Sequence, residues 1–198
     1  TSTIGVQAAR AVHNTLLDAG FEYIDAPVSG GISGAQAASI AVMFAGSEAA
    51  LKRLTPILSP MCGHLLHVGS KPGQGQAMKV LNNFLSGTAM VATSEAIAFG
   101  LTQGLDMARM LDVLNVSSGA NSATRDKFPH RILTGSYDGG FAARLMLKDV
   151  SLYLESVKGA GTPGGVAQVV YDQWLALREA EPDADFTRMF AMMSQHDD

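Results

Sequence analysis

The spacing of apolar residues divides the chain near residue 73. Before it, Val12, Leu16 and Leu17 recur at helical spacing and predict a helix that ends at Gly20. Short apolar runs flanked by Gly, Pro or Ser predict strands over 21–26, 40–45 and 65–68. Between the last two strands, Ser47 and Glu48 open an expected helix over 47–58. Pro60 is expected to end it. This order of elements predicts an α/β layer.

After Gly73 apolar residues recur three and four positions apart, and no convincing strand pattern follows. The pattern predicts an all-helical region with breaks at glycines and at Pro182. Helices are expected over 74–103, 106–116, 121–134, 142–160, 166–180 and 186–194, and residues 195–198 are expected to fray. We therefore expect one domain over 1–72 and a second, built on one long helix, over 73–198.

A layer of three strands that opens directly on a helix leaves its sheet short of partners. The sequence thus predicts that residues 1–72 are the C-terminal part of a larger α/β domain, whose preceding strands lie upstream.

Composition narrows the class of function. The 198 residues include 47% apolar and 16% charged residues, and the formal net charge is −4. Without a basic field, nucleic-acid binding is not expected. The single cysteine, Cys62, cannot form an internal disulfide, and the longest uncharged stretch contains several polar residues. We expect a cytoplasmic protein without a membrane span.

Lys79 is the chain's most informative charged residue. It is the only charged residue between Lys71 and Glu95, and its helical neighbours are apolar. Burial disfavours an ammonium group and lowers the pKa of a lysine, which makes it usable as an acid or base near neutral pH. Asn83 follows at i+4, so both side chains point to one face of the helix. A solvated helix lysine is the competing interpretation.

Two further segments could bind ligands. The turn Ser29-Gly30-Gly31 exposes backbone N–H groups that a carboxylate could approach closely, although it could also be a plain loop. Lys148 and Asp149 interrupt an apolar helical stretch, a pattern that taken alone favours a helix surface.

Other sites are less well supported. The glycines at 73 and 75 are not followed by a third glycine at the dinucleotide spacing, nor by a P-loop Lys-Ser/Thr. Cys62, His64 and His67 lack a fourth metal ligand nearby, so no metal is expected.

Three segments of the chain can be compared with known family signatures. In chain order they are Asp25-Ala-Pro-Val-Ser-Gly-Gly31, Gly73-Gln-Gly-Gln-Ala-Met-Lys-Val-Leu-Asn-Asn83, and Phe141 through Lys148-Asp149. Together they resemble the signatures of the β-hydroxyacid dehydrogenase family, which includes 3-hydroxyisobutyrate dehydrogenase and tartronate semialdehyde reductase. The resemblance implies the remnant of a Rossmann-type domain followed by a helical domain like the C-terminal domain of 6-phosphogluconate dehydrogenase.

The resemblance also implies roles for individual residues. Lys79 would be the general acid/base, and Asn83 would hold the substrate hydroxyl or carboxylate. Ser29, Gly30 and Gly31 would bind the carboxylate. Thr3, Phe141 and Lys148 would contact the cofactor, NAD or NADP. The implied enzyme transfers a hydride between the nicotinamide and a small 3-hydroxy acid or its semialdehyde.

Family members begin with a Gly-x-Gly-x-x-Gly unit that binds the pyrophosphate, and this unit is not found in residues 1–198. We therefore expect the 198-residue chain alone to bind cofactor poorly and to show no reductase activity, which an assay with NADH or NADPH would test.

Two rival functions remain open: a non-catalytic relative used for dimerisation, and an enzyme like the imine reductases. The presence of Lys79 together with Asn83 and the Ser-Gly-Gly turn argues against the first, and Lys79, where imine reductases generally carry another residue, argues against the second. The long apolar helix suggests a homodimer or higher oligomer formed through the helical domain.

Overall fold

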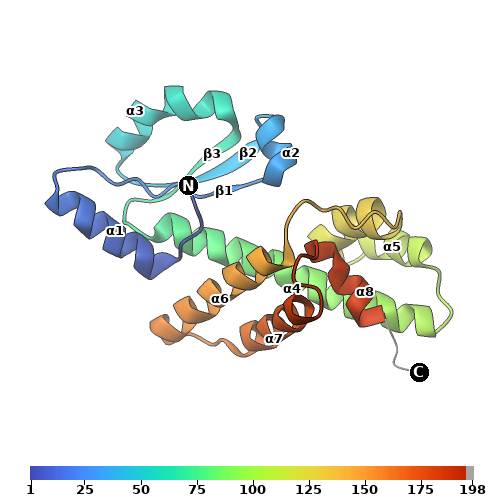
Figure 1. Cartoon of the computed structure of the whole chain (residues 1–198). Helices are drawn as coiled ribbons and strands as arrows, with labels where there is room; N and C mark the ends of the chain where they lie inside the picture. The colour runs from blue at the N-terminus through green and yellow to red at the C-terminus, as the bar shows by residue number, and fades with distance from the viewer. Residues whose placement is uncertain (195–198) are drawn as a thin grey trace. The chain divides into compact units, whose positions relative to one another are not determined.

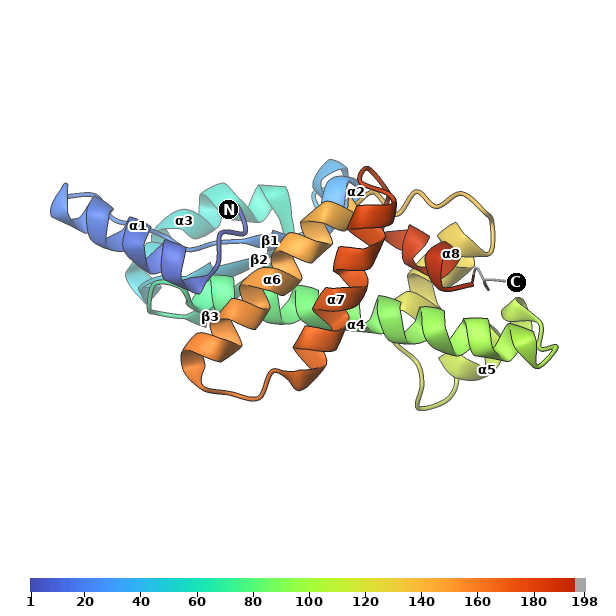
Figure 2. The ribbon, with the colours of Figure 1, turned by 60° about the horizontal axis from the view of Figure 1, so that its bottom comes forward.

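The computed structural model describes residues 1–194, which form two compact units. The first contains Thr1–Asn82 and Ser151–Pro163, and the second contains Asn83–Val150 and the residues from Gly164 onward. The helices α4 (Gln74–Thr102) and α6 (Ala143–Ala160) each contribute to both units. Figure 2 shows α4 as one continuous helix. The fraying expected for residues 195–198 lies outside the described residues.

The first unit is built on a sheet of β1 (Val28–Ser29), β2 (Ile40–Ala45) and β3 (Cys62–Gly69), in that spatial order. β1 is antiparallel to β2, and β2 is parallel to β3. The strand expected over 40–45 is confirmed residue for residue. The strand expected over 65–68 is confirmed but already begins at Cys62.

Helices α1 (Val6–Asp18), α2 (Gly31–Gln36) and α3 (Glu48–Leu58) complete this unit. α3 starts where the sequence predicts, because the Ser47 side chain accepts a hydrogen bond of 3.1 Å from the Ala50 backbone N–H. α3 lies beside the sheet (Figure 1), and its apolar face packs with the buried strand residues Val42 and Phe44. Sheet and α3 thus share one small hydrophobic core.

One expectation for this unit is wrong. The segment 21–26 is not a strand: only Asp25 forms a β-bridge, with Ala45, and Pro27, which has no N–H, follows before β1 begins. After Gly30 the chain forms the short helix α2, which the residue pattern did not predict. α3 ends at Leu58, as expected from Pro60, and the 3₁₀ helix η1 (Ser59–Met61) follows it directly.

The second unit is helical, as expected. The helices α5 (Met107–Asn115), α6 and α7 (Gly165–Ala180) confirm the helices expected over 106–116, 142–160 and 166–180. They pack with α4 around one hydrophobic core, in which α7 crosses α4 (Figure 2). The largest fully buried side chains of this core are Trp174, Phe128, Met90, Ile97, Leu177 and Met189.

Two helices of this unit differ in type from the expectation. The helix expected over 121–134 is a π-helix, η2 (Ala123–Ile132). Pro129 lies inside it, where an α-helix would lose a hydrogen bond and bring the proline ring against the Arg125 carbonyl. The helix expected over 186–194 starts as the 3₁₀ helix η3 (Phe186–Arg188) and continues as α8 (Met189–Ser194).

α4 is long and apolar enough to cross a membrane by length and composition alone. This is weak evidence, because the core helix of a soluble protein passes the same test and 50% of the most apolar window of α4 is buried inside the protein.

Candidate active site

The candidate site is organised by the buried face of α4. The polar residues Gln76, Lys79 and Asn83 recur on this face three and four positions apart, with Val80 between them. Lys79 is only 8% exposed and Asn83 only 6%. The structure therefore places the predicted acid/base lysine and its asparagine on one buried face, rather than on a solvated one.

The first turn of α4 lies very close to the sheet because Gly75 has no side chain. A Cβ atom there would lie 2.9 Å from the carbonyl oxygens of Asp25 and Met43, and 2.9 Å from Cδ of Pro27. This glycine therefore serves close packing of the helix on the strands, and not a phosphate.

Gln76 and Asp25 form a buried polar cluster with the first residues of the chain. The Gln76 Oε1 atom accepts hydrogen bonds from the backbone N–H groups of Ile4 (2.9 Å) and Gly5 (3.2 Å). The Gln76 Nε2 atom donates to Ser2 O (3.1 Å) and to Asp25 Oδ1 (3.0 Å). Asp25 Oδ2 accepts from the Gln76 backbone N–H at 2.9 Å. We call this cluster the Gln76 clasp.

Thr3, the predicted cofactor contact, lies in the segment that the Gln76 clasp holds, and it is half-buried. Asp25 is almost fully buried, with 1% of its surface exposed. The pKa of the Tyr23 phenol is raised, mainly because Tyr23 is partly buried and secondly because Asp25 carries a negative charge.

Ser29, Gly30 and Gly31 connect the end of β1 to the start of α2. Gly30 has a φ of 135° and Gly31 a φ of 63°, conformations that favour glycine. At Gly30 a Cβ would also meet Ile40 at 3.2 Å, so this position has no room for a side chain. Gly30 and Gly31 are exposed and Ser29 is half-buried, which leaves this turn accessible.

In the second unit, Asn83 on α4 meets Asp149 on α6. The Asn83 Nδ2 atom donates a short hydrogen bond of 2.5 Å to Asp149 Oδ2. Lys148 Nζ lies 2.8 Å from the other carboxylate oxygen, Oδ1. The expected surface position is correct for the Lys148 side chain, which is 44% exposed, and wrong for that of Asp149, which is 3% exposed.

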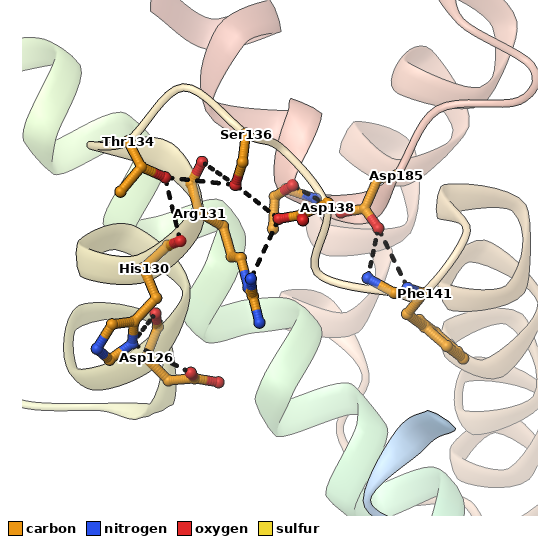
Figure 3. A network of polar contacts seen from close by, with 10 residues as sticks. Asp126, His130, Arg131, Thr134, Ser136, Asp138, Phe141 and Asp185 are labelled. Atoms are coloured by element: carbon orange, nitrogen blue, oxygen red, sulfur yellow. Dashed lines mark hydrogen bonds and ion pairs between the residues drawn. The ribbon is translucent and has the colours of Figure 1, made fainter. Parts of the chain in front are cut away.

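Phe141, the other predicted cofactor contact, is fixed by Asp185. The Asp185 Oδ2 atom accepts from the backbone N–H groups of Gly140 (2.8 Å) and Phe141 (3.2 Å), as Figure 3 shows for the labelled pair. The Phe141 ring packs edge-on against Phe186, with 6.1 Å between the ring centroids. The loop before α6 is thereby tied to the segment before α8.

Of the two histidines considered as metal ligands, His67 takes part in a hydrogen bond and a ring contact within the first unit. His67 Nε2 lies 2.8 Å from the Gly46 carbonyl, and its ring packs edge-on against Phe44. Within residues 1–194, no cluster of three or more His, Cys, Asp or Glu side chains could hold a metal ion.

Gln76, Asp25 and Asp149 are buried polar residues of the site to which the sequence pattern assigned no role. The signal for Gln76 was present, because it precedes Lys79 by three residues and Asn83 by seven, on the same helical face. Asp149 likewise follows Met146 by three residues on the buried face of α6.

Two family models match the chain. The model described as the NAD-binding domain of NADP-dependent 3-hydroxyisobutyrate dehydrogenase covers residues 73–193, and that of the NAD binding domain of 6-phosphogluconate dehydrogenase covers residues 1–69. The matches meet between β3 and α4.

Similar proteins support the same assignment. The 2-(hydroxymethyl)glutarate dehydrogenase of Eubacterium barkeri is 35% identical over 82% of this chain and 54% of its own length. A solved structure of Mycobacterium tuberculosis 3-hydroxyisobutyrate dehydrogenase with L-serine matches with a TM-score of 0.90 and 32% identity, over 98% of this chain and 68% of that chain. An imine reductase of Streptomyces aurantiacus shares the fold, with a TM-score of 0.55, 19% identity, and coverage of 98% of this chain and 69% of that chain.

The chain spans 54% and 65% of the lengths of the first two curated relatives that it matches. The three-stranded α/β layer followed by helices on one long helix is thus the architecture of a Rossmann-type remnant and a helical domain, as predicted.

Proposed function

We propose a function from the premise that this chain belongs to the β-hydroxyacid dehydrogenase family, whose models match residues 1–69 and 73–193. The intact protein is an oxidoreductase that interconverts a small 3-hydroxy acid and its semialdehyde with NAD or NADP. One observation carries this proposal: Lys79 and Asn83 lie one turn apart on the buried face of α4. A lysine and an amide so placed suit proton transfer at a hydroxyl group.

Lys79 acts as the general acid/base in this proposal. During oxidation it accepts the proton of the substrate hydroxyl, and during reduction it returns that proton. Lys79 is only 8% exposed and thus shielded from bulk water, so the proton passes between the lysine and the reacting oxygen without being lost to solvent. When bound, the nicotinamide accepts or supplies the hydride.

Asn83 presents an acceptor to the substrate, because Asp149 fixes the orientation of its amide. An ionised carboxylate can only accept hydrogen bonds, so the Asn83 NH₂ group must face Asp149 Oδ2. The Asn83 carbonyl oxygen then lies on the other side of the amide. That oxygen suits a donor such as the substrate hydroxyl and not the substrate carboxylate, which is assigned to Ser29, Gly30 and Gly31.

Three residues are proposed to hold the nicotinamide end of the cofactor. Thr3 lies in a segment held at the start of α4, and Phe141 has a fixed backbone. Lys148 is exposed enough to reach a ligand while it pairs with Asp149. Thr3, Phe141 and Lys148 would hold this end of NAD or NADP. The glycine-rich turn that binds the pyrophosphate is not among residues 1–198.

The proposal is tested with the intact protein, any adjoining natural sequence included. Small 3-hydroxy acids and matched 2-hydroxy acids are offered with NAD⁺ and with NADP⁺, and the appearance of reduced nicotinamide is followed. We expect turnover with at least one 3-hydroxy acid and a preference over its 2-hydroxy isomer. Cofactor binding without oxidation of any 3-hydroxy acid would refute the proposal.

Replacement of Asn83 by alanine is expected to raise KM for the hydroxy acid or lower kcat, with a combined loss on the order of tenfold in kcat/KM, the worth of about one hydrogen bond. Asp149→Asn should give a similar but smaller loss, since a neutral amide no longer forces the Asn83 NH₂ group to one side. Steady-state kinetics of both variants check this. Unchanged constants in both would contradict the roles of Asn83 and Asp149.

A non-catalytic dimerisation module and an imine-reductase-like enzyme are the rival functions, and the retained Lys79 disfavours both.

A homodimer or higher homo-oligomer, formed through the helical unit, is nevertheless part of the proposal. The exposed apolar side chains Phe99, Val166 and Val169, which line one groove of that unit, support it. Light scattering should give a mass of at least two chains, and a monomer at assay concentration would contradict it. We also propose a cytoplasmic setting, which suits the unpaired Cys62.

A further inference from the structure

The side-chain amide of Gln76 uses its full hydrogen-bonding capacity. Its oxygen accepts two bonds, from Ile4 and Gly5, and its nitrogen donates two, to Ser2 and Asp25. An amide has no more than two lone pairs and two N–H groups to offer. Gln76 is also only 2% exposed, so no water competes for these bonds.

Three of these four bonds go to the segment that precedes α1. Residues 1–5 form neither helix nor strand. The Gln76 side chain satisfies the N–H groups of Ile4 and Gly5 and the carbonyl of Ser2, groups that flank Thr3 on both sides. One side chain of α4 thereby binds backbone groups on both sides of Thr3.

The same helical turn carries Lys79, which follows Gln76 by three residues on the same face of α4. Residues three apart on a helix have Cβ atoms about 5–6 Å from one another. The Gln76 clasp thus ties the segment assigned to the nicotinamide to the turn that carries the acid/base. Because a reacting geometry is sensitive to displacements of about 1 Å, such a tie matters for the rate.

Asp25 restricts Gln76 in turn. Its carboxylate receives both the backbone N–H and the side-chain N–H of Gln76, which fixes the backbone and the amide orientation at the same time. Helix formation alone does not need the side chain, since the Gln76 backbone N–H is already satisfied by Asp25 Oδ2. The side-chain bonds serve the segment before α1.

We propose that Gln76, held by Asp25, is a positioning residue that sets the distance between the nicotinamide-contacting segment Ser2–Gly5 and Lys79. This inference rests on the proposed function, because it uses the assignments of Thr3 and Lys79. It adds that the amide must be a glutamine: it has to accept on one side and donate on the other.

The first test compares Gln76→Met, which keeps the length of the side chain, with Gln74→Met as the matched control on the same turn. Gln74 is exposed, and its side-chain oxygen accepts a hydrogen bond of 2.8 Å from the Lys71 backbone N–H. In the intact protein, Gln76→Met should lower kcat at saturating cofactor by on the order of 100-fold and leave KM for the hydroxy acid nearly unchanged. Amide hydrogen exchange at Ile4 and Gly5 should accelerate in Gln76→Met only.

The second test asks for rescue. Gln76→Glu keeps the acceptor half of the side chain but places a carboxylate against Asp25, so it should lose activity. Adding Asp25→Asn should restore part of the lost kcat, because the introduced amide can donate to the introduced carboxylate. Recovery is partial, since the Ser2 carbonyl still faces an acceptor. Gln76→Glu also keeps the test decisive if Gln76→Met does not fold.

Leu54→Ala distinguishes a general loss of stability from a loss of positioning. It weakens the core between α3 and the sheet in the same unit, away from the Gln76 clasp. If Gln76→Met only lowers the melting temperature as Leu54→Ala does, with kcat and the exchange of Ile4 and Gly5 unchanged, the positioning role is refuted. If the unaltered protein oxidises no 3-hydroxy acid, the proposed function fails instead. The exchange of Ile4 and Gly5 and the cofactor affinity of each variant then still decide whether the clasp holds the segment.

Discussion

Replacement of Lys79 by alanine is expected to lower kcat by roughly two to four orders of magnitude, the usual contribution of a general acid/base. The folded state should change little in stability, because alanine is the best helix former and the ammonium group no longer has to be buried. Lys79 is 8% exposed and lies on the buried face of α4 that also carries Gln76 and Asn83. Steady-state kinetics and thermal unfolding of the intact protein measure the two effects separately.

The matched control is Lys158→Ala, which removes an exposed lysine from the last turn of α6. It should leave kcat unchanged. Lys79→Met keeps the length of the side chain without the charge and should be as inactive as Lys79→Ala. Full turnover in either Lys79 variant would rule out this lysine as the acid/base.

The second large effect is expected from Gly75→Ala, and it concerns both stability and activity. In a helix this change ordinarily stabilises by roughly 0.5–1 kcal/mol. Here the new Cβ would lie 2.9 Å from two carbonyl oxygens and from the ring of Pro27, so the first turn of α4 must move off the sheet. We expect a net loss of about 1–3 kcal/mol, with occasional larger values for overpacked sites.

Gly165→Ala provides the control, because Gly165 lies at the start of α7 and nothing lies within 4 Å of its added Cβ. It should be neutral or slightly stabilising. Since Lys79 follows one turn after Gly75, the displaced helix should also lower kcat. Urea unfolding and kinetics check both effects, and a Gly75→Ala variant as stable and active as Gly165→Ala would contradict the close contact.

Most elements could be predicted from the sequence where local pattern and packing agree. The apolar run of β2 and the periodic pattern of α4 each allow one conformation, and Ser47 caps α3 as its residue type suggests. The prediction of a strand over 21–26 was wrong. Its aromatic and branched residues suit a strand, but strand pairing also depends on the neighbouring segment of the sheet, to which only Asp25 is bridged. The π-helical hydrogen bonding of η2 likewise has no simple signature in residue type.

The site was predictable in part. An isolated lysine among apolar residues, with an amide at i+4, indicated the buried face of α4 correctly. The pattern could not indicate that Asp149 turns inward to meet Asn83, because burial of an aspartate depends on a partner 66 residues away in the chain. The Gln76 clasp was equally unpredictable, since Gln76 binds Asp25, 51 positions away, and the first residues of the chain, more than 70 positions away.

The central claim is that Lys79 assists a hydride transfer from a 3-hydroxy acid. It is tested most directly with a substrate that carries deuterium on the hydroxyl-bearing carbon. Mass spectrometry of the reduced nicotinamide then shows where that atom goes. We predict that the intact protein transfers the deuterium to the cofactor and that Lys79→Ala transfers it at least about a hundredfold more slowly. Reduced cofactor without deuterium, or equal transfer by the Lys79→Ala variant, would contradict the account.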